Sequence, residues 1–348
     1  MKKQYWNLVH KMKILIIQKK FMGDVLVTST ILPLLKKKYP QSEISFLLEE
    51  KHAQILLGNP YIDQFLFFHK EGLKKTISQL KEYQFDLVID LYSKIETAMI
   101  TFFSGAKTKI GFFKKYTQFF YTHAVKRSTQ VKSKNTTFGI EHRLQMLEPL
   151  GIPFQEVFPK VYLQKDELAK AHQILSENGL SSQDNLVMIS TFGSSEEKTY
   201  PIEYMAQLLG YVADYKPEAK ILCNYLPSQK ELFEALYSQL SEKTKASIVK
   251  NFDTKNLREF AAVTSLCKCL IGNEGGATNV SKSLDIPTFT IFSPHICIED
   301  WAWSSNPNVD KFLHITDFLE SSKNYSDFKP IFLKPDLEEF LDATIVKN

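Results

Sequence analysis

The stretch that decides the fold runs from Cys269 to Phe292 and reads CLIGNEGGATNVSKSLDIPTFTIF. Its apolar start predicts a buried strand, Thr278–Leu284 predicts a helix, and Thr288–Phe292 predicts a second strand. Between the first strand and the helix lie Gly275 and Gly276, which let the backbone approach a ligand closely. Because a helix N-terminus presents free N–H groups and a positive dipole end, this turn suits an anion such as a phosphate. An ordinary strand–turn–helix without a ligand is the alternative.

The first half of the chain alternates strands and helices in the same way. Four apolar runs predict buried strands there: 13–17, 44–48, 64–68 and 85–91. A helix is expected from Val25 to Tyr39, with Asp24 as its N-cap and a kink or break at Pro33. This alternation indicates a doubly wound α/β domain, whose sites lie beyond the carboxyl ends of the strands. Asp24 and Asp90 both fall at such strand ends.

The second half repeats the pattern, so the predicted fold class is α/β with two doubly wound parallel-sheet halves and a cleft between them. Before the final strand–turn–helix–strand stretch, strands are predicted at 185–190, 219–224 and 247–249. We place the N-terminal domain at 1–165 and the C-terminal domain at 166–330. Residues 331–348 are expected to form a C-terminal helix that could pack back on the N-terminal domain.

Composition assigns the chain to the soluble globular proteins. It has 348 residues, 44% hydrophobic and 24% charged, which suits about two domains with a sizeable core. Four cysteines are too few for a disulfide framework at this size. No apolar run reaches the length of about 18 residues that a transmembrane helix needs, and the N-terminus lacks the apolar centre of a signal peptide. We therefore expect a cytoplasmic protein.

Charge is unevenly distributed along the chain. The net charge of +4 is too small to indicate nucleic-acid binding, but the span from Thr97 to Ile140 contains no acidic residue. That span holds eight lysine and arginine residues, interleaved with nine phenylalanine and tyrosine residues. A basic and aromatic surface suits anionic lipid head groups or an anionic glycolipid. Aromatic residues in the core beside solvated lysines are the alternative.

A second candidate binding loop, Gly193–Lys198, follows a predicted strand and precedes a predicted helix. The hydroxyls of Ser194 and Ser195, the backbone N–H groups and the Lys198 ammonium are what a diphosphate needs, although a solvated connection would look the same. The Walker pattern and a clean G-x-G-x-x-G are absent, which disfavours P-loop and dinucleotide enzymes. The sequence has no D-x-D pair at a strand end that would suggest binding of a divalent metal ion, so no metal site is expected.

Several of these segments, taken in order, resemble glycosyltransferase family 9, the heptosyltransferases of lipopolysaccharide assembly. The matching pieces are spread over nearly the whole chain: KILII at 13–17, MGDV at 22–25, NPYID at 59–63, FDLVIDL at 85–91, GA at 105–106, IGF at 110–112, KTYP at 198–201 and NEGGATN at 273–279. Each piece alone is weak, and their order and spacing carry the resemblance.

The resemblance implies a GT-B fold, in which the first Rossmann-like domain binds the acceptor and the second binds a nucleotide-sugar donor. It implies a metal-independent, inverting transfer without a cofactor, moving a heptose-like sugar, with ADP-heptose as the expected donor. The acceptor would be a lipopolysaccharide-core or lipid-linked hydroxyl, reached by a protein peripheral to the inner face of the cytoplasmic membrane.

Site roles follow from the same resemblance. Asp24 matches the general base that takes the proton of the acceptor hydroxyl. Lys198 matches a residue that contacts the donor phosphates and stabilises the departing diphosphate. The remaining donor-binding residues that it implies are Ser194, Ser195, Glu274, Gly275, Gly276, Ala277 and Asn279.

Three departures from the family pattern leave other readings open. Glu274 stands where the family has Asp, Asn279 where it has His, and Tyr200 where it has Trp. A different donor sugar or base is compatible with these changes. The alternatives are a sugar-nucleotide epimerase of the same architecture and a nucleotide-sugar-binding protein that has lost its activity.

Overall fold

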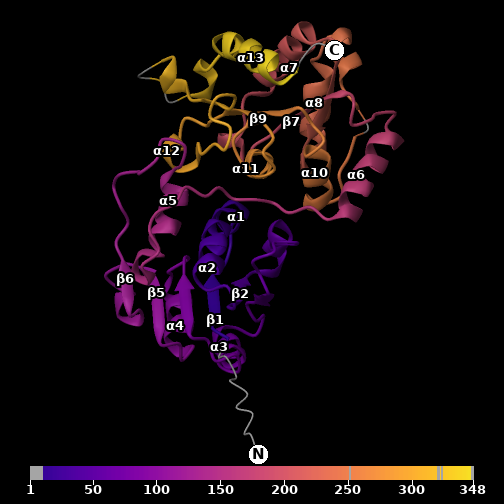
Figure 1. The fold of residues 1–348 in the computed structure, drawn as a ribbon. Helices are drawn as coiled ribbons and strands as arrows, with labels where there is room; N and C mark the ends of the chain where they lie inside the picture. Colours follow the sequence, from indigo (N-terminus) through magenta and orange to yellow (C-terminus); the bar gives the residue numbers. More distant parts are fainter. Residues whose placement is uncertain (1–10, 251, 320–321, 323, 346–348) are drawn as a thin grey trace, which may run out of the picture. The chain divides into compact units, whose positions relative to one another are not determined.

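The computed structural model describes residues 11–250, 252–319, 322 and 324–345 (Figure 1). The N-terminal residues 1–10, where no signal peptide is predicted, lie outside the described residues. The chain divides into two compact units. Unit 1 extends to Lys132 and includes Phe138–Pro159, and unit 2 consists of Ser133–Thr137 and the chain from Lys160 onward.

Unit 1 is built on a six-stranded sheet in the order β3-β2-β1-β4-β5-β6, and every pairing in it is parallel. Its strands are β1 Lys13–Ile17, β2 Glu43–Leu48, β3 Gln64–Phe67, β4 Leu87–Asp90, β5 Thr108–Phe112 and β6 His123–Val125. Its helices are α1 Met22–Thr28, η1 Ser29–Ile31, α2 Leu32–Lys38, η2 Glu50–Leu56, α3 Leu73–Lys81, α4 Ile95–Phe103, η3 Gln118–Phe120, α5 Phe138–Gln145 and η4 Glu148–Leu150.

The central strand β1 explains why this sheet forms. Ile14 to Ile17 are fully buried, as expected for a parallel strand covered on both faces. Ile14 pairs with Ile44 on one side and with Leu87 on the other, so β1 has a neighbour on each edge. Because the chain leaves β1 for β2 and later returns to place β4 on the opposite side, the winding direction reverses between β1 and β4. Ligands of such sheets bind outside the carboxyl ends of the strands at this point.

The predicted long helix after β1 is interrupted, as Pro33 indicated. It consists of α1, the short 3-10 helix η1 and α2, with Pro33 in the first turn of α2. Proline is tolerated at that position because its missing N–H would have no partner within the helix.

Unit 2 holds a five-stranded parallel sheet in the order β11-β10-β9-β7-β8, whose winding reverses between β7 and β9. Its strands are β7 Asn185–Ser190, β8 Ala219–Asn224, β9 Cys269–Asn273, β10 Thr288–Ile291 and β11 Lys311–Leu313. Its helices are α6 Lys165–Glu177, η5 Glu196–Lys198, α7 Ile202–Tyr215, η6 Pro227–Gln229, α8 Lys230–Ser238, α9 Glu242–Ser247, α10 Leu257–Thr264, α11 Gly276–Ser283, α12 Ile298–Trp301, η7 Ile315–Asp317, η8 Tyr325–Asp327 and α13 Pro330–Thr344. The strand predicted at 247–249 is reduced to a single bridge between Ile221 and Ile248.

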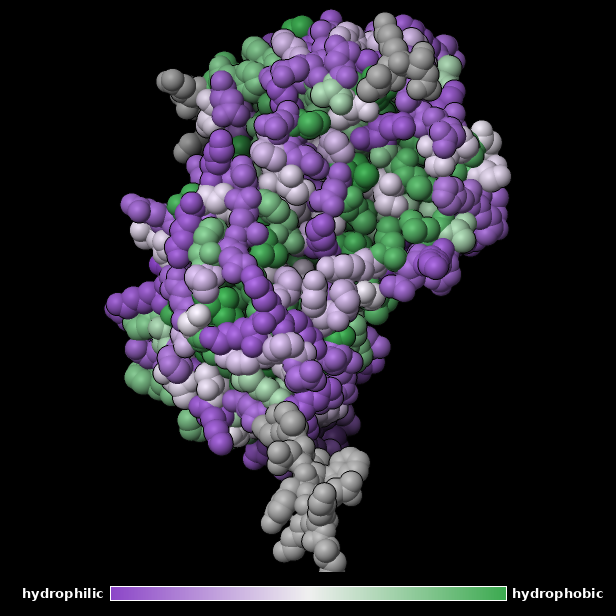
Figure 2. Space-filling model, in the orientation of Figure 1, coloured by the Kyte–Doolittle hydropathy of each residue, from purple (hydrophilic) through white to green (hydrophobic). Residues whose placement is uncertain are grey.

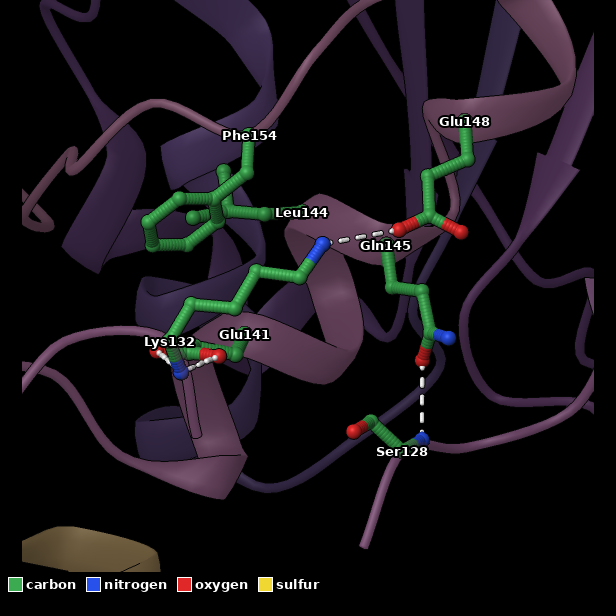
Figure 3. A pocket seen from close by; sticks show the side chains of 7 residues that line it. All are labelled: Ser128, Lys132, Glu141, Leu144, Gln145, Glu148 and Phe154. Carbon is green, nitrogen blue, oxygen red and sulfur yellow. Dashed lines mark hydrogen bonds and ion pairs between the residues drawn. The ribbon is translucent and has the colours of Figure 1, made fainter. Parts of the chain in front are cut away.

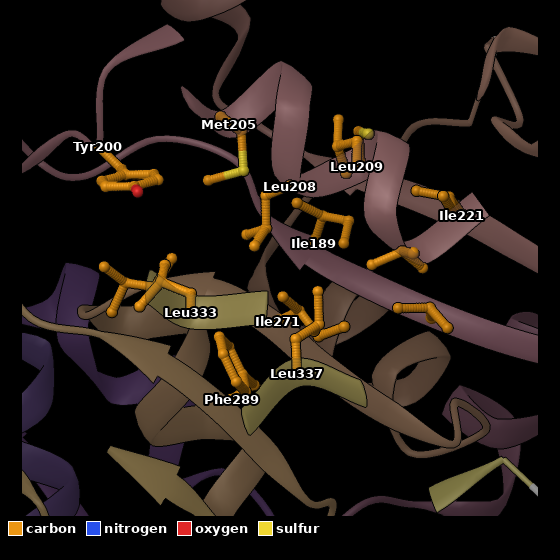
Figure 4. Close-up of a cluster of buried hydrophobic side chains, with 14 of the residues drawn as sticks. Ile189, Tyr200, Met205, Leu208, Leu209, Ile221, Ile271, Phe289, Leu333 and Leu337 are labelled. Atoms are coloured by element: carbon orange, nitrogen blue, oxygen red, sulfur yellow. The ribbon is translucent and has the colours of Figure 1, made fainter. Parts of the chain in front are cut away.

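The core of unit 2 places the C-terminal helix. Side chains of β7, β9 and β10 pack with α7 and α13 in one buried cluster (Figure 4). Leu333 and Leu337 of α13 are fully buried in this cluster, and Lys216 donates a hydrogen bond of 2.8 Å to Asp342. The sequence analysis left open that residues 331–348 pack back on the N-terminal domain. In the structure α13 packs within unit 2, because its apolar face completes the core of that unit.

No helix among the described residues is long and apolar enough to cross a bilayer. Figure 2 shows hydrophilic residues over much of the visible surface, with hydrophobic residues gathered in places between them.

Candidate functional site

In unit 1, Asp24 lies just beyond the carboxyl end of β1, on α1. The helix begins at Met22, because Phe21 has a φ of 69° and turns the chain before it. Asp24 is therefore inside the first helical turn, and the prediction that it caps the helix is wrong. A carboxylate in the first turn is favoured by the positive end of the helix dipole.

Arg143 fixes the position of Asp24. Its Nη2 donates a hydrogen bond of 2.5 Å to Asp24 Oδ1, and its Nε donates to the hydroxyl of Thr28 at 3.2 Å. The arginine side chain is 11% exposed and the aspartate side chain 30% exposed, so the pair is held by the protein while the carboxylate still reaches solvent. Oδ2 of Asp24 has no hydrogen-bond partner within the described part of the chain. That oxygen can accept a proton or a hydroxyl group.

The helix α5 that carries Arg143 is itself anchored. It packs on α1, and the backbone N–H of Lys132 donates to both carboxylate oxygens of Glu141 at 2.7 Å. Gln145 accepts a hydrogen bond from Ser128 N–H at 3.1 Å. These residues line a cavity of about 10 Å³, room for about one water molecule (Figure 3). The cavity is too small for a ligand, and the hydrogen bonds of Glu141 and Gln145 beside it anchor the helix that carries Arg143.

A larger hollow of about 170 Å³ lies at the opposite edge of the same sheet. It is lined by Lys13, Glu43, Ser45, Asp63, Gln64, Tyr83 and Phe85, which belong to or adjoin the amino ends of β1, β2, β3 and β4. Ligands of doubly wound sheets bind at the carboxyl ends, so this hollow is not the candidate site.

Asp90 ends β4 and is fully buried at the reversal point of the first sheet. It accepts hydrogen bonds from the backbone N–H groups of Tyr92 and Ser93, at 3.1 and 2.8 Å, and from the Tyr121 hydroxyl at 2.8 Å. Burial raises the pKa of Asp90 to about 6, against this network of donors. The Asp90 carboxylate therefore holds the loop after β4 in place through these hydrogen bonds.

The raised pKa of Asp90 predicts a specific pH dependence. Because the folded protein binds the proton more tightly than the unfolded chain, the free energy of unfolding should fall as pH rises between 3.8 and about 6. At 1.36 kcal/mol per pH unit this loss approaches about 3 kcal/mol. Asp90→Asn cannot titrate, so urea unfolding from acid to neutral pH should show wild type losing about this much relative to the variant. Parallel curves for the two proteins would contradict the assignment.

In unit 2, the loop from Thr191 to Tyr200 leaves the carboxyl end of β7, and Asn273 ties it to the neighbouring strand. Asn273 is the last residue of β9 and is fully buried. Its Nδ2 donates to the carbonyl oxygens of Ser190 and Thr191 at 3.0 and 2.9 Å. Its Oδ1 accepts from Tyr200 N–H at 2.6 Å. One amide thus holds both ends of the loop against β9.

Two glycines permit the close approach that this arrangement requires. A Cβ on Gly272 would lie 2.4 Å from the Ser190 carbonyl oxygen, and the residue has a φ of +132°, which side chains rarely adopt. A Cβ on Gly193 would lie 2.2 Å from the Lys198 carbonyl oxygen. The loop is therefore folded tightly on itself, which leaves Ser194, Ser195 and Lys198 exposed.

The turn from Glu274 to Ala277 adjoins this loop at the sheet's reversal point. It leads into α11, whose N-terminus begins at Gly276. Burial raises the pKa of Glu274, while the charges of Lys282 and Lys198 lower it. The Glu274 carboxylate makes no hydrogen bond to any residue that the structure describes, so its acceptor positions are available to a hydroxylated ligand.

Asn279 supports the turn from behind. Its Nδ2 donates to the Gly275 carbonyl oxygen at 3.0 Å, and its Oδ1 accepts from Trp303 Nε1 at 3.2 Å. The side chain is buried, with both polar ends used inside the protein. In this structure it contacts the backbone of the turn, so its effect on a ligand would pass through Gly275.

Two further residues near Glu274 are ones that sequence reasoning missed. Lys282 is buried on α11, donates to the Trp301 carbonyl oxygen at 2.8 Å and lies 4.4 Å from the centre of the Trp303 ring. Burial lowers its pKa to about 7, opposed by Asp310 and Glu274. The Tyr325 hydroxyl is buried without a hydrogen-bond partner among the described residues, and burial together with the charge of Glu274 raises its pKa.

No group of three or more His, Cys, Asp or Glu side chains suited to a metal ion occurs in the ranges that the structure describes. The three cysteines inside the sheet region, Cys223, Cys267 and Cys269, are buried as free thiols, and burial raises the pKa of each.

Comparison with known proteins identifies the family. A model described as glycosyltransferase family 9 (heptosyltransferase) matches residues 73–312, which is more than half of the chain. The chain belongs to glycosyltransferase family 9. It is accordingly a glycosyltransferase, and the predicted resemblance is confirmed.

Relatives of family 9 extend over nearly the whole chain. Lipopolysaccharide heptosyltransferase 1 of Campylobacter coli is 25% identical over 91% of this chain and 94% of its own length. A family 9 structure from Veillonella parvula has a TM-score of 0.76 at 19% identity, covering 97% of this chain and 98% of that one. E. coli heptosyltransferase WaaC with ADP-2-deoxy-2-fluoro heptose has a TM-score of 0.68 at 18% identity, covering 94% and 99%. These likenesses confirm the GT-B class of fold.

The predicted site residues thus form two groups. Asp24 stands in unit 1 beside an arginine that the sequence analysis did not select. In unit 2 the structure brings the Ser194–Lys198 loop to the Glu274–Ala277 turn, at adjacent strand ends. Arginine usage could have pointed to Arg143, because the chain has only three arginines, Arg127, Arg143 and Arg258, among 43 basic residues. In a chain this rich in lysine, an arginine indicates a position where the planar guanidinium group, which can donate several hydrogen bonds in a fixed geometry, is required.

Proposed function

We propose that this family 9 member transfers a heptose-like sugar from ADP-heptose to a hydroxyl of a lipopolysaccharide-core or lipid-linked acceptor, with inversion at the sugar. The observation that carries the proposal is the joining of the Lys198 loop to the Glu274–Ala277 turn by Asn273, at the reversal point of the second sheet. Ligands of such sheets bind at this point. The ADP-heptose analogue named with the E. coli relative supports the choice of donor.

Each residue has a role in the proposed step. Asp24 takes the proton of the acceptor hydroxyl as its oxygen bonds to the anomeric carbon, and the bond from that carbon to the diphosphate breaks on the opposite face. Lys198 compensates the negative charge that grows on the departing diphosphate. Ser194, Ser195 and the backbone of Gly275, Gly276 and Ala277 contact the phosphates, and Glu274 accepts hydrogen bonds from sugar hydroxyls.

We also propose that the transfer needs neither a metal ion nor a cofactor. The Lys198 ammonium and the free N–H groups at the start of α11 supply the positive charge that a diphosphate requires. A chelator should therefore leave the rate unchanged, and a loss of rate restored by magnesium would contradict this part of the proposal.

The acceptor is assigned to unit 1, which carries Asp24 and corresponds to the predicted N-terminal domain, and the donor to unit 2, which corresponds to the predicted C-terminal domain together with α13. A lipid-linked acceptor would be met by a cytoplasmic protein at the inner face of the membrane. This placement rests on the acceptor class and is proposed together with it.

Thermal unfolding with a panel of nucleotides tests the donor assignment. ADP at about 100 times its dissociation constant should add roughly 2.7 kcal/mol to the free energy of unfolding and raise the Tm, with EDTA or with magnesium. UDP, GDP and CMP serve as matched controls. A shift with one of these in place of ADP would replace the donor, and donor turnover without any acceptor would favour an epimerase. No shift with nucleotides or with intact nucleotide sugars would contradict the proposal.

A further inference from the structure

Helix α4 carries apolar side chains on the face that points to solvent as well as on its inward face. The inward face, which covers the sheet of unit 1, holds the buried residues Thr97, Ala98, Ile100 and Thr101. Its outward positions carry Ile95, Phe102 and Phe103, which are 56, 48 and 43% exposed. A surface helix of a globular protein normally carries polar residues on the face that points to solvent. The exposed apolar side chains therefore need an explanation other than core packing.

A neighbouring segment extends this apolar surface. In η3, Phe119 is 75% exposed, and the Phe120 ring lies 5.7 Å from the Phe102 ring, edge to face. Phe102 and Phe103 are 5.1 Å apart, also edge to face. We call Phe102, Phe103, Phe119 and Phe120 the α4–η3 cluster. Single exposed hydrophobic residues are ordinary, whereas a contiguous group marks an interaction site.

The surroundings of the α4–η3 cluster are basic. Lys107 and Lys109 lie at the amino end of β5, to which the end of α4 leads, and Lys115 lies in the loop that carries η3. Lys81 ends α3, which packs on α4. None of these four lysines forms an ion pair with any described residue. The acidic residue of α4, Glu96, lies at the other end of the helix and is bonded to Lys19 at 2.5 Å. In Figure 2 hydrophobic and hydrophilic residues are interleaved at the lower left, where Figure 1 labels α4, β5 and β6.

We propose that the α4–η3 cluster is a docking surface for an anionic lipid bilayer. Exposed phenylalanine rings insert at the boundary between head groups and acyl chains, and lysines around them are attracted to anionic head groups. Charge complementarity favours this partner over a second copy of the chain, because a like-charged copy would bring two sets of unpaired lysines together. The inference rests on the proposed placement at the inner face of the membrane and names the surface that would meet it, although binding to lipid itself requires neither the donor nor the acceptor.

Co-sedimentation with vesicles tests the proposal on the full-length protein. Wild type should bind phosphatidylcholine vesicles that contain phosphatidylglycerol, bind pure phosphatidylcholine weakly, and lose affinity as salt is raised. Phe102→Ser/Phe119→Ser should lower the partition coefficient at least about tenfold, since each change removes an apolar side chain available for burial. Lys109→Gln/Lys115→Gln should lower it roughly fivefold for each lysine removed.

Matched variants outside the cluster serve as controls. Ile331→Ser removes a 56% exposed apolar side chain from α13, and Lys165→Gln/Lys255→Gln removes two exposed lysines of unit 2. Both should bind anionic vesicles like wild type. Equal binding of the two vesicle types, no binding to either, or unchanged binding of Phe102→Ser/Phe119→Ser would overturn the proposal. So would a dimer in sedimentation that the phenylalanine variant abolishes, because the cluster would then face a second copy.

The vesicle result is separable from the proposed transfer reaction. The vesicle assay contains no nucleotide sugar, and the Tm shift with ADP contains no lipid, so each can fail alone. Phe102→Ser/Phe119→Ser should keep the wild-type rate on a lipid-free acceptor fragment and lose rate on an acceptor in anionic vesicles. A loss on the lipid-free fragment would contradict a docking role for the cluster.

Discussion

Replacing Asp24 by asparagine is expected to lower kcat by about 10²- to 10⁴-fold, the usual contribution of a general base at an attacking hydroxyl. The substitution is nearly isosteric, and the amide oxygen can still accept the hydrogen bond from Arg143. What is lost is the capacity of the freely accessible carboxylate oxygen to take a proton. Single-turnover transfer rates with saturating donor would measure this loss directly.

The matched control for Asp24→Asn is Asp63→Asn, the same chemical change at another ion-paired aspartate of unit 1. Asp63 accepts hydrogen bonds of 2.7 Å from Lys36 and from the backbone N–H of Ile44, at an edge of the sheet remote from the carboxyl ends. The Asp63→Asn variant should retain the wild-type transfer rate. ADP should stabilise Asp24→Asn as much as wild type, because the donor residues lie in unit 2. A wild-type rate in Asp24→Asn would remove Asp24 as the base.

Replacing Lys198 by alanine should have the second largest effect. A charge-assisted hydrogen bond to phosphate contributes about 1.5–3 kcal/mol, so the affinity for ADP should fall about 10- to 100-fold. Loss of a group that stabilises developing charge should lower kcat/KM by about 10²- to 10³-fold. Titration calorimetry with ADP and with AMP would locate the contact, because a lysine on the second phosphate should matter less for AMP.

Stability is not expected to confound the Lys198 experiment. The Lys198 side chain is exposed and forms no hydrogen bond or ion pair within the described ranges, so its removal should change the free energy of unfolding by less than about 0.5 kcal/mol. Lys255→Ala, an exposed lysine elsewhere in unit 2, is the control. Equal affinity of Lys198→Ala for ADP would move the phosphate site to another part of the protein.

Much of the fold could be predicted because buried parallel strands are nearly continuous apolar runs. β1, β4, β7 and β9 have this character, and the sequence places them within a few residues of their true ends. β5 and β6 were missed because β5 contains Lys109 and β6 has only three residues. The strand predicted at 247–249 was wrong because α9 takes the chain to Ser247, leaving one bridge at Ile248.

The candidate site could be predicted only where it is local in sequence. A loop or turn between a predicted strand and a predicted helix can be recognised from the sequence alone. The Ser194–Lys198 loop and the Glu274–Ala277 turn were selected for this reason. Arg143 and Asn273 were not, because their importance comes from contacts with residues 119 and 73 positions away, respectively. Tyr325 was missed for the same reason, since the charge of Glu274 reaches it only in the folded unit.

The three hydrogen bonds of Asn273 have a consequence for how tightly a donor can bind. A flexible loop that closes over a ligand loses conformational entropy at that moment, and the affinity is reduced accordingly. Here the ends of the Thr191–Tyr200 loop are already fixed to β9 by a buried amide, so most of that ordering has occurred during folding. The nucleotide would bind to a loop that is already ordered. Its dissociation constant would then be determined mainly by its contacts with the protein and little by the free energy of rearranging the loop.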